Sequence, residues 1–469
     1  MGRRLVLLAS LLFALAGAEP VAAATPQQLT IAASDGVKLA CSLVEPAGSP
    51  PAGGWPAVML FHGLGGRHQD LEPAAVQYLA PAGYATLECD ARGHGASGGL
   101  FGLDGPRDVR DTKELFAWLA ARPEISDTAI GALGLSLGGA AVWNAATAGV
   151  PFKAIVPMIT WTDLTSALAP QGLSKSGLIL YLAQLVPEAR WEPDLLAAEP
   201  GLVQSQNLAQ VTALAAPRSP RPGLRSLGVP TLLIQGRRDF LFDLDQALAA
   251  YRLLRGPKRL YLGDLGHAPA ANPAAEAPRY YGEALRWLDR YVKGIPNGID
   301  AQPRVELAHD PWDGKTTSYR ALPATRAASI SLPGRARIES GGGKVVRAAR
   351  ITGGPHETFG DSAVTVAYSD ARSWDRLVAV LTVEARGRET VISAGGTKLA
   401  GAQGTARIAL MDESVRVPAG GRLVLYLGAT STVQSSGDAL YLADVRPGAS
   451  ITIGRAKLTL SMLKKAASR

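Results

Sequence analysis

The sequence predicts an α/β fold with a mostly parallel sheet, followed by an all-β region of the sandwich or jelly-roll type. From residue 28 to 292, short β-branched or apolar runs alternate with helical stretches, which is typical of parallel strands joined by crossover helices. Beyond residue 304, Gly, Pro, Ser or Asp turns separate segments with a period of two. Such segments occur at residues 363–368, 377–383, 406–411, 422–427 and 450–453.

The elements of the first region follow from local patterns. A Ser-Asp-Gly turn at residues 34–36, between two extended runs, predicts an opening hairpin over 29–44. Apolar residues on one helical face predict a helix at 108–121, and a second helical stretch is predicted at 280–292. Further strands are predicted at residues 58–61, 85–89, 130–135, 154–159, 231–235 and 259–262.

One connection, from Ile159 to Val229, is much longer than the others. Ordinary connections are short, so we expect a helical lid at about residues 160–228 over the carboxyl edge of the sheet. A Gly-Ile-Pro-Asn-Gly stretch at 294–298 is typical of a linker. The predicted divisions are a signal peptide at 1–24, an α/β domain at 25–293, a linker at 294–303 and a β domain at 304–469.

The first residues have the pattern of a secretory signal. Arg3 and Arg4 precede an apolar run at 5–18, and small residues at 21–24 offer a cleavage site. The run is shorter than the roughly 20 apolar residues that a membrane anchor needs, and no later stretch is long enough to span a bilayer. We therefore expect a secreted or periplasmic protein with no stable membrane span.

Composition excludes several classes of protein. With 47% hydrophobic residues and only 2 Cys, the chain is neither disordered nor a disulfide-built miniprotein. Its net charge of +8 is spread without a basic block, which argues against a nucleic-acid partner. Cys41 and Cys89 fall in predicted strands that are neighbours in the fold, so they could form a disulfide or remain buried free thiols.

The strongest chemical signal is Gly134-Leu135-Ser136-Leu137-Gly138-Gly139, which lies between a predicted strand and the predicted helix 140–148. A sharp strand-to-helix turn leaves no room for side chains beside its central residue and holds that residue out at the helix N-terminus. Ser136 is therefore the predicted nucleophile. The alternative is a Gly-rich turn with a purely structural role.

A serine nucleophile needs a base, and the base needs a carboxylate to orient it. His267 is the only histidine after Ser136 in this region, and both His267 and Asp239 directly follow predicted strands. Parallel strands deliver their carboxyl ends to one edge, so the three side chains should converge there. Three other acids compete less well, because of their place in the next helix or their closeness to the histidine: Asp243, Asp245 and Asp264.

Acyl transfer also needs donors for the developing oxyanion. We assign this role to the backbone N–H groups of Leu137 and of Leu64, which lies in a Gly-rich turn after the third strand. His62 in the same turn is expected to brace the loop. No spacing of His, Cys and carboxylates suits a metal, and no phosphate loop follows a strand, so the chemistry should need no cofactor.

With these residues in place, residues 28–292 resemble the α/β-hydrolase superfamily. The segment Asp90-Ala91-Arg92-Gly93-His94-Gly95-Ala96-Ser97-Gly98-Gly99 is similar to the Asp-x-Arg-Gly-x-Gly-x-Ser-x-Gly signature of the cocaine-esterase and X-Pro dipeptidyl-peptidase group (CocE/NonD, peptidase S15-like). The resemblance implies a C-terminal jelly roll and structural roles for Asp90 and Arg92. It also implies a triad of Ser136, Asp239 and His267.

The chain departs from cocaine-esterase-like members at two places. They have an oxyanion-hole tyrosine after the third strand, where this chain has His62-Gly63-Leu64, and typically a tyrosine after the serine, where this chain has Leu137. The expected function is a secreted serine hydrolase that cleaves carboxylic esters or small amides through an acyl-enzyme on Ser136. One alternative is an X-Pro dipeptidyl-peptidase-like enzyme acting on short peptides. The other is a non-catalytic binding protein on a hydrolase scaffold.

Overall fold

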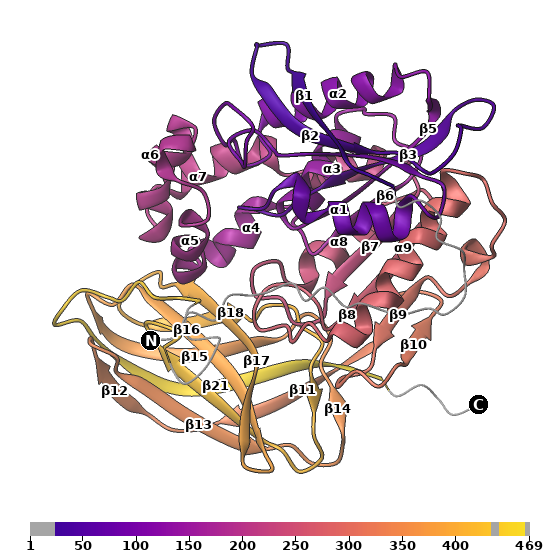
Figure 1. Cartoon of the computed structure of the whole chain (residues 1–469). Coiled ribbons are helices and arrows are strands. Elements are labelled where there is room, and N and C mark those ends of the chain that lie inside the picture. The colour runs from indigo at the N-terminus through magenta and orange to yellow at the C-terminus, as the bar shows by residue number, and fades with distance from the viewer. Residues whose placement is uncertain (1–23, 433–439, 465–469) are drawn as a thin grey trace.

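The computed structural model describes residues 24–432 and 440–464, and Figure 1 shows their arrangement. The predicted signal peptide falls outside this part of the chain, apart from Ala24. Within the described ranges, no helix is long and apolar enough to cross a membrane.

A ten-stranded sheet forms the centre of the first region. Its strands are β1 (Gln27–Ala32), β2 (Lys38–Val44), β3 (Trp55–Phe61), β4 (Ala85–Cys89), β5 (Ile125–Leu135), β6 (Ile155–Met158), β7 (Thr231–Gly236), β8 (Lys258–Gly263), β9 (Val305–Ala308) and β10 (Thr316–Tyr319). They lie in the order β1-β2-β4-β3-β5-β6-β7-β8-β9-β10. The neighbours from β4 to β9 are parallel, and the outer pairs are antiparallel. The predicted hairpin and mostly parallel sheet are therefore confirmed.

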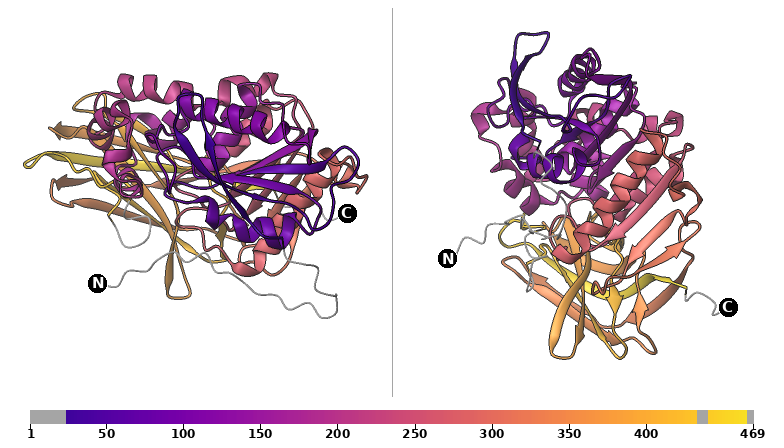
Figure 2. Two further views of the ribbon diagram at one scale, coloured as in Figure 1. Left: turned by 45° about the horizontal axis from the view of Figure 1, so that its top comes forward. Right: turned by 45° about the vertical axis from the view of Figure 1, so that its right-hand side comes forward.

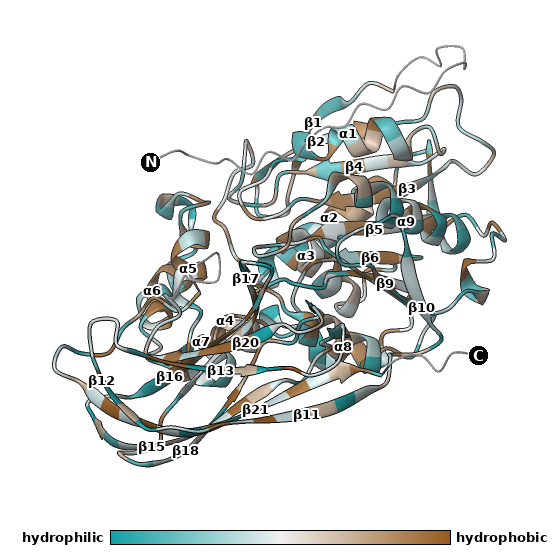
Figure 3. Cartoon of the chain, turned by 90° about the horizontal axis from the view of Figure 1, so that it is seen from below, coloured by the Kyte–Doolittle hydropathy of each residue, from teal (hydrophilic) through white to brown (hydrophobic). Residues whose placement is uncertain are grey.

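Helices cover both faces of this sheet (Figure 2), which explains why central strands such as β6 and β7 are buried along their whole length. Figure 3 shows the largely hydrophobic residues of the central strands in brown. They are α1 (Glu72–Ala74), α2 (Pro106–Ala120), α3 (Leu137–Thr147), α8 (Leu244–Leu253) and α9 (Ala277–Tyr291). One face packs against α2, α3 and α8 through residues such as Leu119, Trp143 and Leu248. The other face packs against α9 through Trp287 and Leu288.

The long connection between β6 and β7 is helical, as predicted. It contains α4 (Leu164–Leu168), α5 (Ser176–Ala183), α6 (Pro193–Val203) and α7 (Leu208–Ala215). Figure 1 shows this lid beside the sheet and next to the strands of the second region. The backbone N–H of Gly177 in α5 donates to the carbonyl of Leu440, so the lid contacts the second region directly.

The structure moves the boundary between the two regions. The predicted linker at 294–303 and the predicted β domain from 304 place residues 305–319 in the second region, but β9 pairs in parallel with β8 and β10 pairs with β9. All four residues of β9 are buried. These two strands therefore complete the first sheet, and the second region begins after Tyr319.

The second region is an antiparallel sandwich. Its strands are β11 (Thr325–Leu332), β12 (Ala336–Glu339), β13 (Lys344–Arg350), β14 (His356–Glu357), β15 (Ala363–Arg372), β16 (Arg376–Ala385), β17 (Arg388–Lys398), β18 (Gly404–Ala409), β19 (Arg416–Val417), β20 (Arg422–Gly428) and β21 (Ser450–Leu463). A five-stranded sheet containing β21 and a four-stranded sheet in the order β13-β20-β16-β17 enclose one apolar core. The predicted all-β region is confirmed.

Strand β16 is apolar on both faces because its two faces pack in two different apolar clusters. Leu377 and Leu381 point into the core of the sandwich. Val378 and Val380 lie in a separate cluster with Phe240, which belongs to the loop after β7. The second region therefore supports a loop of the first.

A buried carboxyl group lies in the middle of the first sheet. Glu88 in β4 has no exposed surface; one of its oxygens accepts a hydrogen bond from Thr86 Oγ1 at 3.2 Å and the other has no partner among the described residues. Burial raises the pKa of Glu88 from 4.5 to about 8. The fold therefore favours the neutral acid.

We expect the Glu88→Gln variant to gain stability over the wild type as the pH rises. The folded pKa lies above the unfolded one, so the wild type loses stability between pH 4.5 and about 8, whereas glutamine does not titrate. One such group contributes a slope of up to about 1.4 kcal/mol per pH unit. Thermal unfolding at pH 5, 7 and 8.5 measures the effect, and a difference in Tm that is the same at all three values would contradict it.

Candidate active site

The turn from β5 to α3 carries Ser136 in a strained conformation, with φ 55° and ψ −119°. A Cβ atom at Gly134 would lie 2.2 Å from the carbonyl oxygen of Gly138, and one at Gly138 would lie 2.2 Å from that of Phe61. Only glycine fits at these two positions. A positive φ at a non-glycine residue costs on the order of 1–3 kcal/mol and is typical of functional turns.

The structure brings the three predicted side chains together. Ser136 Oγ lies 3.0 Å from Nε2 of His267, and Nδ1 of His267 lies 2.8 Å from Oδ2 of Asp239. Since Nδ1–H donates to the carboxylate, Nε2 is free to accept the serine proton. Ser136, Asp239 and His267 follow β5, β7 and β8, whose carboxyl ends meet at one edge of the sheet.

The Asp239 carboxylate is fully buried and accepts four hydrogen bonds. Oδ1 accepts the backbone N–H groups of Leu241 and Phe242 at 3.0 and 2.9 Å, and Oδ2 accepts the backbone N–H of His267 at 3.1 Å in addition to its ring. All four partners are donors. They fix the direction of the carboxylate toward the ring.

The competing acids have other partners. Asp264 forms an ion pair with Arg238 at 3.0 Å, and Asp245 forms one with Arg221 at 3.0 Å. Asp243 is the N-cap residue of α8, and its Oδ2 accepts the backbone N–H of Asp412 at 3.3 Å. None of the three bonds to His267 in the described structure.

Ser136 opens onto an apolar cavity of about 110 Å³. Leu64 and Leu137, the predicted oxyanion donors, line the same cavity. Most of the remaining wall comes from the lid, and among the described residues Glu199 is the only formally charged one that lines the cavity. Other lining residues are Phe101, Trp161, Ile179, Leu182, Trp191 and Val211.

A family model now decides where the chain belongs. The model for X-Pro dipeptidyl-peptidase (S15 family) matches residues 35–269, about half of the chain, and this span includes the Ser-His-Asp arrangement. The chain belongs to the X-Pro dipeptidyl-peptidase (S15) family. Membership in the S15 family supports a serine hydrolase of the ester- or peptide-cleaving type.

Solved structures share the fold of this S15 member over almost its whole length. A CocE/NonD family hydrolase from Staphylococcus aureus is 16% identical, covers 93% of both chains and has a TM-score of 0.74. An α-amino acid ester hydrolase is 15% identical, with a TM-score of 0.67 over 96% of this chain and 98% of its own. An aminopeptidase from a marine sediment Thaumarchaeota archaeon is 14% identical, with a TM-score of 0.67 over 97% and 99%.

One curated relative is an uncharacterised 31.7 kDa protein of Escherichia coli. It is 33% identical over 109 residues, which is 23% of this S15 member. The match spans only 38% of the length of that relative.

His62, in the Gly-rich turn after β3, has a structural role in this S15 member. His62 is buried; its Nε2 accepts the N–H of Ala91 at 2.8 Å, so its Nδ1 donates to the carbonyl of Gly63 at 2.7 Å. Burial lowers the pKa of His62 and keeps the ring neutral. The expected bracing role of His62 is confirmed, and it fixes the turn that presents Leu64.

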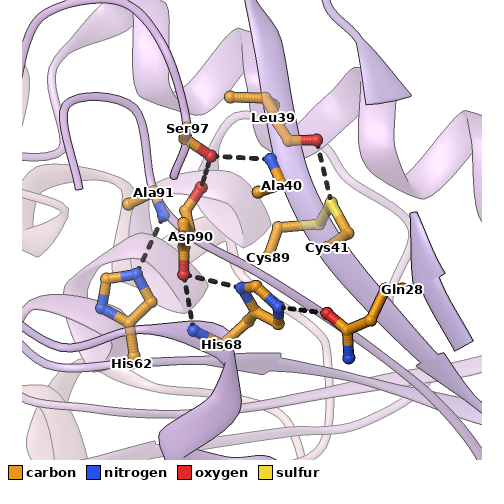
Figure 4. The surroundings of a disulfide bond; sticks show 10 residues. All are labelled: Gln28, Leu39, Ala40, Cys41, His62, His68, Cys89, Asp90, Ala91 and Ser97. Carbon is orange, nitrogen blue, oxygen red and sulfur yellow. Dashed lines mark hydrogen bonds and ion pairs between the residues drawn. A yellow bond between two sulfur atoms is a disulfide. The ribbon is translucent and has the colours of Figure 1, made fainter. Parts of the chain in front are cut away.

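Asp90 and Arg92 hold the segment that follows β4. Asp90 Oδ1 accepts the ring N–H and the backbone N–H of His68 at 2.8 and 2.7 Å (Figure 4). Asp90 Oδ2 accepts the backbone N–H of Ala96 at 2.7 Å. Burial alone would raise the pKa of Asp90, but these N–H groups lower it. Arg92 forms a two-point ion pair with Asp111 at 2.8 Å.

Cys41 and Cys89 form a disulfide bond beside this network (Figure 4). They lie directly opposite each other in the antiparallel β2–β4 pair. The bond therefore fastens the strand that leads into Asp90.

Among the described residues, no group of three or more His, Cys, Asp or Glu could hold a metal ion.

Two neighbours of the site were not predicted from the sequence. The ring of Phe242 packs edge-on against His267 with centroids 5.2 Å apart, and Lys175 of the lid reaches the loop that carries Asp239. Both contacts join residues far apart in the sequence, so no local pattern signals them.

Proposed function

We propose that this protein is a secreted serine hydrolase that cleaves carboxylic esters or small amides through an acyl-enzyme on Ser136. The observation that carries the proposal is the continuous chain of hydrogen bonds from Ser136 through His267 to Asp239 at the mouth of an apolar cavity. The site contains a nucleophile, a base and an orienting carboxylate in the arrangement that acyl transfer needs.

In the proposed reaction, Ser136 Oγ attacks the substrate carbonyl as His267 Nε2 takes the serine proton. The N–H groups of Leu64 and Leu137 stabilise the oxyanion of the tetrahedral intermediate. His267 then gives its proton to the leaving alcohol or amine, which leaves an ester on Ser136. Water, deprotonated by the same nitrogen, attacks this ester, releases the acid and restores the serine.

The cavity favours an apolar acyl group. Its lining places almost no charge near the substrate, and dry apolar cavities of about this size hold a benzene-sized group. Esters with a short or medium acyl chain or a phenyl ring therefore fit best.

A peptide substrate is the second candidate, because of the S15 family and of Glu199. Glu199 lines the cavity, and a carboxylate there would attract a cationic substrate amine. Purified mature protein should be offered a series of p-nitrophenyl acyl esters and Ala-Pro-p-nitroanilide. The ester proposal expects a larger kcat/KM for the esters, and faster turnover of the anilide would reverse the order of the two candidates.

We expect the Ala198→Phe variant to lose activity on long acyl chains while activity on acetate persists. Ala198 in α6 is buried and lines the cavity, so a phenyl ring there fills part of its volume. KM for p-nitrophenyl octanoate should rise about tenfold or more relative to KM for p-nitrophenyl acetate. This factor corresponds to the loss of the contacts of one or two CH₂ groups. Ala197→Phe is the matched control, since Ala197 is exposed on the same helix. Equal effects of both variants would contradict this placement of the acyl group.

Export is also part of the proposal. It rests on the N-terminal pattern at residues 1–24 and agrees with a disulfide, which persists in oxidising compartments. N-terminal sequencing of the protein recovered from the periplasm or medium should give a chain that begins near residue 24 or 25.

A further inference from the structure

Lys175 is a buried lysine of the lid whose side chain reaches the loop that follows β7. Its side chain is 1% exposed, although lysines are rarely buried this deeply. Nζ donates to the carbonyl oxygens of Phe240 and Leu241, at 2.8 and 3.1 Å. These two residues directly follow Asp239.

The same two peptide groups bind Asp239 at their other end. The peptide between Phe240 and Leu241 gives its oxygen to Lys175 and its N–H to Asp239 Oδ1. The peptide between Leu241 and Phe242 does the same. A trans peptide holds its C=O and N–H in one plane and pointing in opposite directions, so a cation that fixes the oxygen also aims the N–H. Two peptide dipoles thus lie in line between an ammonium and a carboxylate.

Acidic side chains lie near the buried ammonium of Lys175. Burial lowers the pKa of Lys175, but Asp243, Asp239 and Glu413 act against this shift. Glu413 of the second region is also buried, and burial together with the neighbouring carboxylates raises its pKa well above 4.5. A buried cation without carboxylates nearby would be costly, and here Asp239 and Asp243 supply them.

The loop that follows Asp239 cannot move to compensate for the hydrogen bonds that it would lose with Lys175. The ring of Phe240 packs among Val378, Val380 and Met411 of the second region. The N–H of Phe240 donates to the carbonyl of Ala268, the residue after His267. The peptides that bind Asp239 are therefore held by packing on one side and by Lys175 on the other.

We propose that Lys175 is a positioning residue for the reaction at Ser136: its ammonium orients the two peptide groups that hold Asp239 Oδ1, which keeps Oδ2 aimed at His267. Lys175 acts only through Asp239 and does not touch the substrate. This inference rests on the proposed function.

The first test is Lys175→Met, which keeps the length of the side chain and removes its charge and donors. We expect kcat on p-nitrophenyl butyrate to fall by about 10- to 100-fold, the range for losing hydrogen bonds to a charged group, with KM within about twofold of wild type. A rise in KM with unchanged kcat would mean that Lys175 anchors only the lid, and it would overturn the proposal.

A double-mutant cycle separates positioning from a general structural role. Because Lys175 acts through Asp239, Lys175→Met should cost almost nothing more in an Asp239→Asn background. An equal loss in both backgrounds would overturn the proposal. Lys258→Met is the matched control, since Lys258 Nζ also donates to two carbonyls, those of Tyr251 and Leu254, at a distance from the site, and it should leave kcat unchanged.

If Lys175→Met does not fold, the pair Lys175→Met with Asp243→Asn removes one charge of each sign, and its kcat is compared with that of Asp243→Asn alone. The same 10- to 100-fold loss is expected, and equal kcat values would refute the role of Lys175. Ser136→Ala separates a failure of the proposed function from a failure of the inference about Lys175. Activity that survives Ser136→Ala defeats the proposed function itself, whereas activity that needs Ser136 and Asp239 but not Lys175 defeats only this inference.

Discussion

Replacing Ser136 with alanine is expected to lower kcat on p-nitrophenyl esters by on the order of 10⁵- to 10⁶-fold, because within residues 24–432 and 440–464 no other hydroxyl is bonded to His267. Alanine occupies the turn as serine does, with the same positive φ, and removes only one oxygen, so the fold and its Tm should be retained. Steady-state kinetics and labelling with a fluorophosphonate measure the loss, and the variant should not be labelled.

The control is Ser126→Ala, which removes a serine hydroxyl from the opposite end of the same strand, β5. This variant should keep full activity and labelling. If Ser136→Ala is labelled as strongly as the wild type, the nucleophile lies elsewhere. If the wild type is not labelled at all, the chain is a binding protein on a hydrolase scaffold.

Much of the fold could be predicted because parallel strands buried on both faces leave a clear signal. The strand at β7 is six residues, all buried, and Gly236 ends it just before Asp239. The nucleophile could be predicted for a related reason: the backbone approaches so closely around Ser136 that only glycine fits at its flanks. Where close backbone contacts allow only one residue type, the sequence pattern predicts the local structure.

The boundary at residue 304 was wrong because β9 has no local signal of its own. Val305–Ala308 is a short strand that could join either sheet, and only its pairing with β8 decides. Lys175 was missed for a similar reason. Its partners are backbone carbonyls at Phe240 and Leu241, and a lysine in an apolar stretch does not reveal which distant carbonyls it will meet.

The role of the second region likewise depends on contacts that no sequence pattern indicates. The N–H of Ser414 donates to the carbonyl of Arg237, and the N–H of Leu244 donates to that of Asp412. Phe240 packs against β16 between these two contacts. The second region therefore holds the loop that carries Asp239 by two backbone hydrogen bonds and one apolar contact.

Asp239→Asn is expected to lower kcat by about 10⁴-fold with little change in KM, because no orientation of an amide satisfies this site. If the amide NH₂ faces His267, it meets the backbone N–H and forces the ring into the tautomer that carries its proton on Nε2, where it cannot accept the proton of Ser136. If the NH₂ faces the other way, it meets the N–H groups of Leu241 and Phe242.

Either orientation sets buried donors against each other, so Asp239→Asn should also lower the Tm, unlike Ser136→Ala. Asp264→Asn is the matched control: Asp264 follows the neighbouring strand β8 and is also buried, but it pairs with Arg238 rather than with the ring. It should keep kcat within about tenfold of wild type, because its loss leaves the hydrogen bond between His267 and Asp239 in place. If Asp264→Asn abolished turnover and Asp239→Asn did not, Asp239 would not be the carboxylate that orients His267 during the reaction, although the folded chain holds it against the ring.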